Sequence, residues 1–329
     1  MSLNKEACDP IIGKGSKFFM TSNIRSWLCG PMVAVATPFK EDLSLDLDAL
    51  TENIRFMVDA GVVTGKGTLL VGGAGGEHPA MNLEERKTVM TTSVEAANGE
   101  VPVLSSVQHT DVRTIVDLAQ HASQIGLNGV QLGPTYYYEP SESDVVRLFQ
   151  KVDEESDINL MIYHTWWEGL TMSLSLIDEL SNIGSVNAMK WSAPEGTLYR
   201  DGLDRFAGTL AIIDNSGEHI LSHVLGASGF ITHLSGFWPE YPAEVWNLLN
   251  DRDYSSAKNK LSAFKWKWRK WVVKVLAYTG GEGPFIKAAM EHVGLRAGPP
   301  RPPSIRLPGH LLEEMIHLFE EAGVPTRKS

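Results

Sequence analysis

The chain has 329 residues, of which 43 % are hydrophobic and 21 % charged, an ordinary globular composition. Its formal net charge of −11 argues against a polyanionic partner such as nucleic acid, and two cysteines, Cys8 and Cys29, are too few for a disulfide framework. We recognise no export signal and no apolar run long enough to cross a membrane, so we expect a cytoplasmic protein without membrane contact.

Hydrophobic patterning divides the chain into a tail and a long alternating region. Residues 1–29 show no hydrophobic period and are predicted to form an N-terminal tail. From there on, short apolar runs typical of buried strands alternate with amphipathic runs typical of helices, such as residues 47–61 and 83–97. The eight apolar runs are residues 31–39, 67–73, 101–107, 129–135, 158–165, 185–192, 210–216 and 229–235.

The count of strand–helix units predicts the fold class. Continuously apolar strands indicate a parallel sheet buried on both faces, and eight units can close into an α/β fold of the (β/α)8 type, a TIM barrel. We predict this barrel over residues 30–250, with an open doubly wound sheet as the alternative. Beyond it the pattern is helical only, so residues 251–329 are predicted to form a C-terminal helical region packed on the barrel.

One segment of the helical region, KWKWRKW at residues 265–271, interleaves basic and aromatic residues as nucleic-acid-binding segments do. However, Phe264, Trp268, Val272 and Val275 recur with helical spacing. We therefore interpret the segment as a packing helix whose lysines line its solvated face.

Polar residues that follow the strands are the candidates for chemistry, because the active site of such a barrel lies at the carboxyl ends of its strands. Lys190 ends the sixth predicted strand and Tyr163 the fifth. A lysine desolvated there would have a lowered pKa and could attack a carbonyl to form a Schiff base, while a tyrosine beside it could transfer protons. Alternatively, Lys190 extends into solvent and Tyr163 is a packing residue.

A family resemblance favours the chemical interpretation. Seven segments carry it: TPF (37–39), GGAGGE (72–77), PTYYYEP (134–140), IYHT (162–165), AMK (188–190), GASGFIT (226–232) and IKAAMEHVGLRAGPPRPP (286–303). In order and spacing they resemble the dihydrodipicolinate synthase and N-acetylneuraminate lyase family. The resemblance implies a TIM-barrel lyase of the class I aldolase type that forms a lysine imine with pyruvate or a related 2-oxo acid, without a cofactor.

The resemblance also implies roles for individual residues. Lys190 matches the imine-forming lysine and Tyr163 the proton-relay tyrosine. Tyr137 matches an aromatic residue that in many members reaches into the neighbouring subunit's site, which implies a homo-oligomer, a dimer or a tetramer. Positions that line the substrate pocket are matched by Asp214, Asn215 and Ile231.

The loop after the second strand departs from the family pattern, which usually carries two hydroxyl side chains there. The corresponding residues here are Gly73, Ala74, Gly75 and Gly76. Their backbone N–H groups can still bind a substrate carboxylate. The proton relay, however, lacks a member unless a water molecule or His164 replaces it.

A second departure concerns Glu168, which lies near the position where many synthase members have an arginine. A carboxylate there would repel an anionic aldehyde, so we predict that the protein is not a true dihydrodipicolinate synthase. Glu168 could instead accept hydrogen bonds from substrate hydroxyls, and Trp166 and Trp167 could stack on the substrate or simply pack. Aldol cleavage and dehydration share the same imine and both stay open.

Two other functions remain as alternatives. Four histidines near the barrel mouth could serve a metal-dependent hydrolase, although no His-x-His pair follows the first strand and we expect no metal. They are His78, His109, His164 and His233. The missing hydroxyls raise the other alternative, a non-catalytic barrel that binds a 2-oxo acid.

Overall fold

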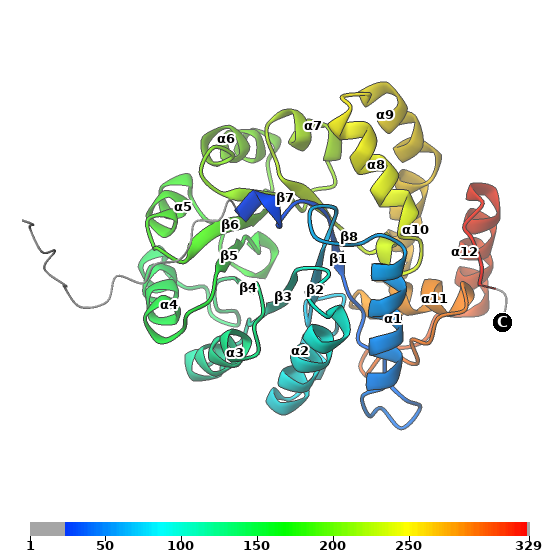
Figure 1. Cartoon of the computed structure of the whole chain (residues 1–329), viewed down its shortest axis with the longest axis horizontal. Helices are drawn as coiled ribbons and strands as arrows, with labels where there is room; N and C mark the ends of the chain where they lie inside the picture. Colours follow the sequence, from blue (N-terminus) through cyan, green and yellow to red (C-terminus); the bar gives the residue numbers. More distant parts are fainter. Residues whose placement is uncertain (1–23, 328–329) are drawn as a thin grey trace, which may run out of the picture.

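The computed structural model describes residues 24–327 as a closed barrel of eight parallel strands surrounded by helices (Figure 1). The strands follow one another around the barrel in sequence order, and β8 pairs with β1 to close it. They are β1 (Gly30–Ala34), β2 (Thr68–Val71), β3 (Val103–Ser106), β4 (Gly129–Leu132), β5 (Leu160–Tyr163), β6 (Val186–Trp191), β7 (Ala211–Asp214) and β8 (Gly229–Thr232). The predicted TIM barrel is confirmed, and the doubly wound alternative is wrong.

Helices follow the strands and then continue alone. The helices that alternate with strands are α1 (Leu47–Asp59), α2 (Leu83–Ala97), α3 (Val112–Gln124), α4 (Glu142–Glu155), α5 (Leu174–Ser181), α6 (Gly196–Phe206), α7 (His219–Val224) and α8 (Glu240–Asn250). The C-terminal helices are α9 (Tyr254–Ala263), α10 (Lys265–Tyr278), α11 (Gly283–His292) and α12 (Gly309–Ala322). Short 3-10 helices are η1 (Ile24–Ser26), η2 (His78–Ala80), η3 (Trp166–Glu168) and η4 (Leu234–Gly236).

Alternation along the strands decides which side chains reach the barrel interior. In β6, Ala188 belongs to the cluster inside the barrel, whereas Met189 packs outward against the surrounding helices. Successive strand side chains point to opposite faces, so Lys190 points inward again. The same alternation in β5 places Met161 and then Tyr163 inside. The carboxyl ends of these two strands therefore point a lysine and a tyrosine into the barrel mouth.

The segment before β1 belongs to the barrel and is not part of a tail. Leu28 is fully buried in the interior cluster together with Met32. The guanidinium of Arg25 donates hydrogen bonds to the carbonyls of Ala207 and Leu210, which fixes the segment beside the amino end of β7. The rest of the predicted tail, residues 1–23, lies outside the described residues.

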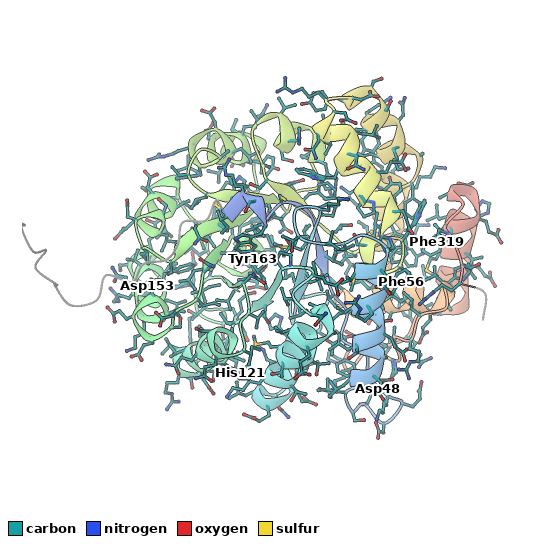
Figure 2. The ribbon with its side chains drawn as sticks, in the orientation of Figure 1. Asp48, Phe56, His121, Asp153, Tyr163 and Phe319 are labelled. Atoms are coloured by element: carbon teal, nitrogen blue, oxygen red, sulfur yellow. The ribbon has the colours of Figure 1, made fainter. Side chains whose placement is uncertain are left out.

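The C-terminal helices share one core with the side of the barrel formed by β8 and α8. This core contains Phe230 from β8, Trp268 from α10 and Phe319 from α12. In Figure 1, α9 to α12 gather on one side of the ring of helices, and Figure 2 shows Phe319 on the outer helix α12. The helix predicted from KWKWRKW is α10, and Trp268 packs as its stripe predicts.

A buried ion pair joins the barrel to this helical region. Glu77, in the loop after β2, contacts Lys287 of α11 at 2.6 Å, and both side chains are almost fully buried. Lys287 also donates to the carbonyl of Pro299, and its amine lies 4.1 Å from the ring centroid of Phe39. The second oxygen of Glu77 accepts a hydrogen bond from the backbone of Arg301. The loop after β2 is thus held against the C-terminal region.

Within residues 24–327, we find no helix that is both long and apolar enough to cross a membrane.

Candidate active site

A cavity of about 480 Å³ opens at the carboxyl ends of the strands, where the sequence predicts the site. Its walls come from the barrel and from the C-terminal helices. Residues from several strand ends line it, among them Leu70, Gly73, Ala74, Gly75, Tyr163, Lys190, Ser192, Asn215, Ile231, Thr232 and His233. Figure 2 shows Tyr163 near the middle of the ring of strands.

Lys190 is the one buried amine at the floor of this cavity among the described residues, and only 6 % of it is exposed. Burial lowers its pKa to about 8, although Glu282 and Glu168 oppose the shift. At pH 7, about one amine in ten is then neutral, against about one in three thousand for the ordinary value of 10.5. The amine is therefore far more available as a nucleophile than a solvated lysine.

Tyr163 lies beside Lys190 because the two residues are paired in the register of β5 and β6. The Lys190 amine is 4.2 Å from the centroid of the Tyr163 ring. Burial, with Glu282 and Glu168 adding to it, raises the pKa of Tyr163 far above its usual value, while a hydrogen bond with Asn215 opposes the shift. The phenol therefore stays protonated and can donate its proton to a developing oxyanion.

The loop after β2 gives the cavity backbone donors in place of side-chain hydroxyls. Gly73, Ala74 and Gly75 line the cavity, and the N–H groups of Ala74 and Gly75 have no hydrogen-bond acceptor within residues 24–327. Adjacent free N–H groups of this kind can bind a carboxylate. Gly76 lies outside the lining, and its carbonyl accepts a hydrogen bond from Thr37.

Glu282, which the sequence did not single out, brings a carboxylate into the cavity from the turn before α11. Its Oε2 lies 3.0 Å from Nε2 of His233, which follows β8. A Cβ atom at Gly75 would lie only 3.3 Å from this oxygen and 3.0 Å from Ile286. Because Gly75 has no side chain, the Glu282 carboxylate can lie close to the loop after β2.

The charge of Glu282 is stabilised by its neighbours. Burial raises the pKa of Glu282, but His233, Lys190 and His78 together lower it more, so that the pKa lies below its usual range. Glu282 is accordingly ionised at neutral pH and interacts with both Lys190 and Tyr163. Glu282 lies in the sequence GGEG (280–283), which shows no helical or strand period and therefore gave no reason to select it. Only the glycines around it could have suggested a close approach to other residues.

Two residues predicted to line the pocket point away from it. His164 is fully buried, its Nδ1 contacts the carbonyl of Ser192, and its Nε2 accepts a hydrogen bond from the backbone of Met172. Asp214 is also fully buried and holds His219 and Tyr199. Each follows an inward-pointing strand residue by one position, so alternation turns it to the outside of the barrel. His164 thus has no free ring nitrogen for a proton relay.

The remaining predicted residues lie around the cavity or outside it. Asn215 and Ile231 line it. Glu168 is exposed in η3, near enough to Lys190 to interact with its charge, but burial still raises its pKa. Tyr137 is 84 % exposed and is not part of the cavity of its own chain. Its proposed role at a neighbouring subunit stays a prediction.

The four histidines do not form a metal site. Nδ1 of His109 accepts a hydrogen bond from the backbone of Asp111, and both nitrogens of His164 are engaged. Nε2 of His233 bonds to Glu282, and its ring packs edge-on against Phe285. Within the described part of the chain, no three His, Cys, Asp or Glu side chains gather closely enough to hold an ion.

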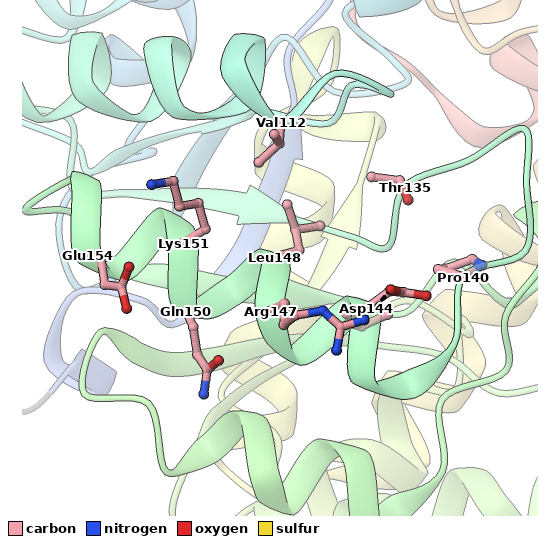
Figure 3. A pocket seen from close by; sticks show the side chains of 10 residues that line it. Val112, Thr135, Pro140, Asp144, Arg147, Leu148, Gln150, Lys151 and Glu154 are labelled. Atoms are coloured by element: carbon pink, nitrogen blue, oxygen red, sulfur yellow. Dashed lines mark hydrogen bonds and ion pairs between the residues drawn. The ribbon is translucent and has the colours of Figure 1, made fainter.

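A second hollow, of about 580 Å³, lies over α4 on the outside of the barrel (Figure 3). Arg147 pairs there with Asp144, and Lys151 pairs with Glu155 on the same helix. These are exposed ion pairs of a solvated helix surface. Among the described residues, its lining holds no buried nucleophile, unlike the cavity at the barrel mouth, which holds Lys190.

A buried amine that faces a tyrosine at the mouth of a closed parallel barrel defines the class of lysine-dependent TIM-barrel lyases. Residues 28–321 match the dihydrodipicolinate synthetase family, and the chain belongs to this family of lyases.

Curated relatives of similar length support this assignment. The 4-hydroxy-tetrahydrodipicolinate synthase of Exiguobacterium sibiricum is 26 % identical over 293 residues, which cover 87 % of this chain and 96 % of that protein. A DapA-like lyase of Thermococcus onnurineus is 26 % identical over 301 residues, which cover 89 % and 98 %.

Solved structures show the same fold. Dihydrodipicolinate synthase from Aquifex aeolicus is 24 % identical and superimposes with a TM-score of 0.80, covering 92 % of this chain and 100 % of its own. YagE from E. coli K12 is a prophage protein of the dihydrodipicolinic acid synthase family that was solved in complex with pyruvate. It is 22 % identical and superimposes with a TM-score of 0.81, covering 90 % of this chain and 99 % of its own.

Proposed function

We propose that the protein is a Schiff-base-forming lyase that cleaves or dehydrates a 2-oxo acid, with Lys190 as the nucleophile. The observation that carries the proposal is the buried amine of Lys190, whose pKa is lowered to about 8, beside the protonated phenol of Tyr163. A solvated strand-end lysine would have neither property.

The first half of the reaction forms the imine. The carboxylate of the 2-oxo acid binds the free N–H groups of Ala74 and Gly75. The neutral amine of Lys190 attacks the C2 carbonyl, and Tyr163 donates its proton to the oxygen as the tetrahedral adduct forms. Loss of that oxygen as water leaves a protonated imine, which withdraws electrons from C3.

The second half uses this electron sink. Removal of a proton from the C4 hydroxyl breaks the C3–C4 bond and gives an aldehyde and an enamine. Removal of a proton from C3 instead expels a hydroxide from C4, which leaves as water after protonation. In either case a base is needed beside the imine, and Glu282 is the ionised carboxylate in the cavity that interacts with Lys190. In the cleavage route the enamine takes a proton at C3 and returns to the imine. Water then hydrolyses the imine in either route and restores Lys190.

The surroundings of Glu168 support a lyase rather than a true dihydrodipicolinate synthase. The segment η3 presents Trp166, Trp167 and the carboxylate of Glu168, with no cation among them. A substrate whose anionic group lies beside Glu168 would be repelled. Nε1 of Trp166 is buried without a partner within residues 24–327 and lines the cavity, so it could donate a hydrogen bond to a substrate hydroxyl.

Borohydride trapping tests the proposal. The purified chain is incubated with pyruvate or longer 2-oxo acids, reduced, and mapped by peptide mass spectrometry. We expect Lys190 to gain the mass of the 2-oxo acid less one oxygen atom, and the Lys190→Arg variant to stay unmodified. Calorimetric binding of the acids without any adduct would instead support the non-catalytic barrel, and would reject the proposal.

A further inference from the structure

Part of the wall of the cavity is formed by the first turns of α10. Lys265 and Arg269 lie one helical turn apart and both line the cavity that contains Lys190. The sequence interpretation placed the lysines of this helix on a solvated face. Lys267, Arg269 and Lys270 are exposed and Lys265 is half-buried, but of these four only Lys265 and Arg269 line the cavity. Helical spacing alone could not show that α10 lies beside the barrel mouth.

The two cationic groups converge on the loop after β7. Lys265 donates to the carbonyl of Gly217 at 3.2 Å, and Arg269 donates to the carbonyl of Ser216 at 2.9 Å. A Cβ atom at Gly217 would lie 2.6 Å from Nη1 of Arg269 and 3.2 Å from Nζ of Lys265. The absence of a side chain at Gly217 therefore allows both charges to meet at one point of the cavity wall.

No described carboxylate forms an ion pair with either cation. Within residues 24–327, neither Lys265 nor Arg269 has an acidic side chain at ion-pair distance, although the chain carries 40 acidic residues. Other lysines of α10 are neutralised, since Lys267 pairs with Glu321 and Lys274 with Glu314 of α12. Two like charges that share only carbonyl acceptors gain free energy when an anion binds between them.

The electrostatics of Lys265 agree with this geometry. Burial lowers its pKa to about 8, the neighbouring charge of Arg269 lowers it too, and Asp214 and Glu218 only partly compensate. Asp214 is already bonded to Tyr199 and to His219, and His219 itself lines the cavity. An anion in the cavity would reach both cations directly.

A further unpaired donor lies in the same cavity. Ser192 is 5 % exposed, follows Lys190 by two positions, and its hydroxyl has no hydrogen-bond partner within the described residues. The volume of about 480 Å³ is several times that of a three-carbon acid, which occupies on the order of 100 Å³. The cavity therefore suits a substrate that extends beyond the imine carbon.

We propose that Lys265 and Arg269 form an anion-binding subsite at the α10 end of the active-site cavity, so that the substrate is a 2-oxo acid with a second anionic group, a carboxylate or a phosphate, at its other end. The inference rests on the imine chemistry proposed for Lys190. It assigns recognition of the distal group to the C-terminal helical region, whereas the imine-forming Lys190 comes from the barrel.

Matched pairs of 2-oxo acids test the subsite. Imine formation is measured as borohydride-trapped Lys190 against the concentration of 2-oxohexanoate, 2-oxoadipate, and a 2-oxo acid of similar length that ends in a phosphate. We expect the wild type to be half-modified at a concentration at least about tenfold lower for one of the two acids with a second charge. Which of them is preferred identifies the distal group.

Variants test whether Lys265 and Arg269 cause the preference for an acid with a second charge. Arg269→Met and Lys265→Met should each remove most of it, while Arg269→Lys should keep part of it. Lys270→Met, which removes an exposed charge from the same helix, is the matched control and should behave as wild type. Adduct formation with pyruvate in every variant shows that the site is folded.

Each result separates the two proposals. Equal concentrations for the singly and doubly charged acids, with pyruvate still trapped at Lys190, overturn the subsite and leave the proposed function in place. A preference that survives in the double variant Lys265→Met/Arg269→Met also overturns it. If no acid is ever trapped, the imine itself is rejected.

Discussion

Two parts of the cavity contribute to it in different ways: the barrel floor, which holds Lys190 and Tyr163 at the strand ends, and the helical wall, which the C-terminal helices form. On the floor, the register of β5 and β6 alone places Tyr163 beside Lys190. On the wall, Glu282 comes from the turn before α11 and Lys265 from the start of α10, so their positions depend on how the C-terminal helices pack against the barrel. Strand pairing can therefore keep the imine chemistry constant while helix packing changes what is bound.

Replacing Lys190 by arginine should have the largest effect, because it keeps a positive charge and removes the nucleophile. We expect no borohydride adduct and a loss of turnover of at least about a thousandfold. Rapid-quench assays and circular dichroism would measure turnover and folding. Residual adduct at another lysine would show that the floor does not hold the reacting amine.

Tyr163→Phe should slow imine formation by about a hundredfold to a thousandfold, because the ring that contacts the Lys190 amine is kept and only the proton donor is lost. Stopped-flow trapping checks the rate. Tyr199→Phe removes a buried hydroxyl that bonds to Asp214 outside the barrel, so it should lower stability by about 1–3 kcal/mol without slowing the imine step. Equal slowing by both would assign Tyr163 a structural role.

The sequence was sufficient to select Lys190 and Tyr163 on the barrel floor, but not Glu282 on the helical wall. Eight buried strands leave short, continuously apolar runs, and a polar residue at the end of a run, such as Lys190, is visible in the sequence. Asp214 was assigned to the pocket from the family resemblance and His164 as a possible relay member, but each lies one residue past an inward-pointing strand residue, and one residue reverses the face. Glu282 follows no period, and nothing local indicates that its turn lies over the barrel mouth.

The buried ion pair between Lys287 of α11 and Glu77 of the loop after β2 joins the barrel to the helical wall, and a substitution at Lys287 would break it. Lys287→Met leaves the Glu77 carboxylate buried without its counter-charge, which should destabilise the fold by about 3–5 kcal/mol. Urea unfolding would measure this. Lys274→Met, which breaks an exposed pair with Glu314, should cost less than about 1 kcal/mol. The double variant Glu77→Gln/Lys287→Met should recover part of the loss, and no recovery would mean that burial of the carboxylate charge is not the cause.

The smallest expected effect concerns the negative charge of Glu282 on the helical wall and its influence on Lys190 on the barrel floor. Glu282 raises the pKa of Lys190 and opposes the shift caused by burial. Glu282→Gln should therefore lower that pKa below about 8. Imine formation needs the neutral amine and increases with pH through this pKa, so the rising limb of its pH profile should move to lower pH. We expect turnover to fall about tenfold, because the base beside the imine is lost.

The control for this variant is the second carboxylate near Lys190. Glu168 also raises the pKa of Lys190, but less than Glu282 does. Glu168→Gln should therefore move the rising limb in the same direction by a smaller amount, and it should not reproduce the loss of turnover, because Glu168 is exposed in η3 whereas Glu282 lines the cavity. Trapping rates between pH 6 and 10 compare the two variants (a range set about the lysine pKa). A limb that moves to higher pH in Glu282→Gln, or a larger shift in Glu168→Gln, would mean that the fifth-strand loop and not the helical wall sets the charge state of the nucleophile.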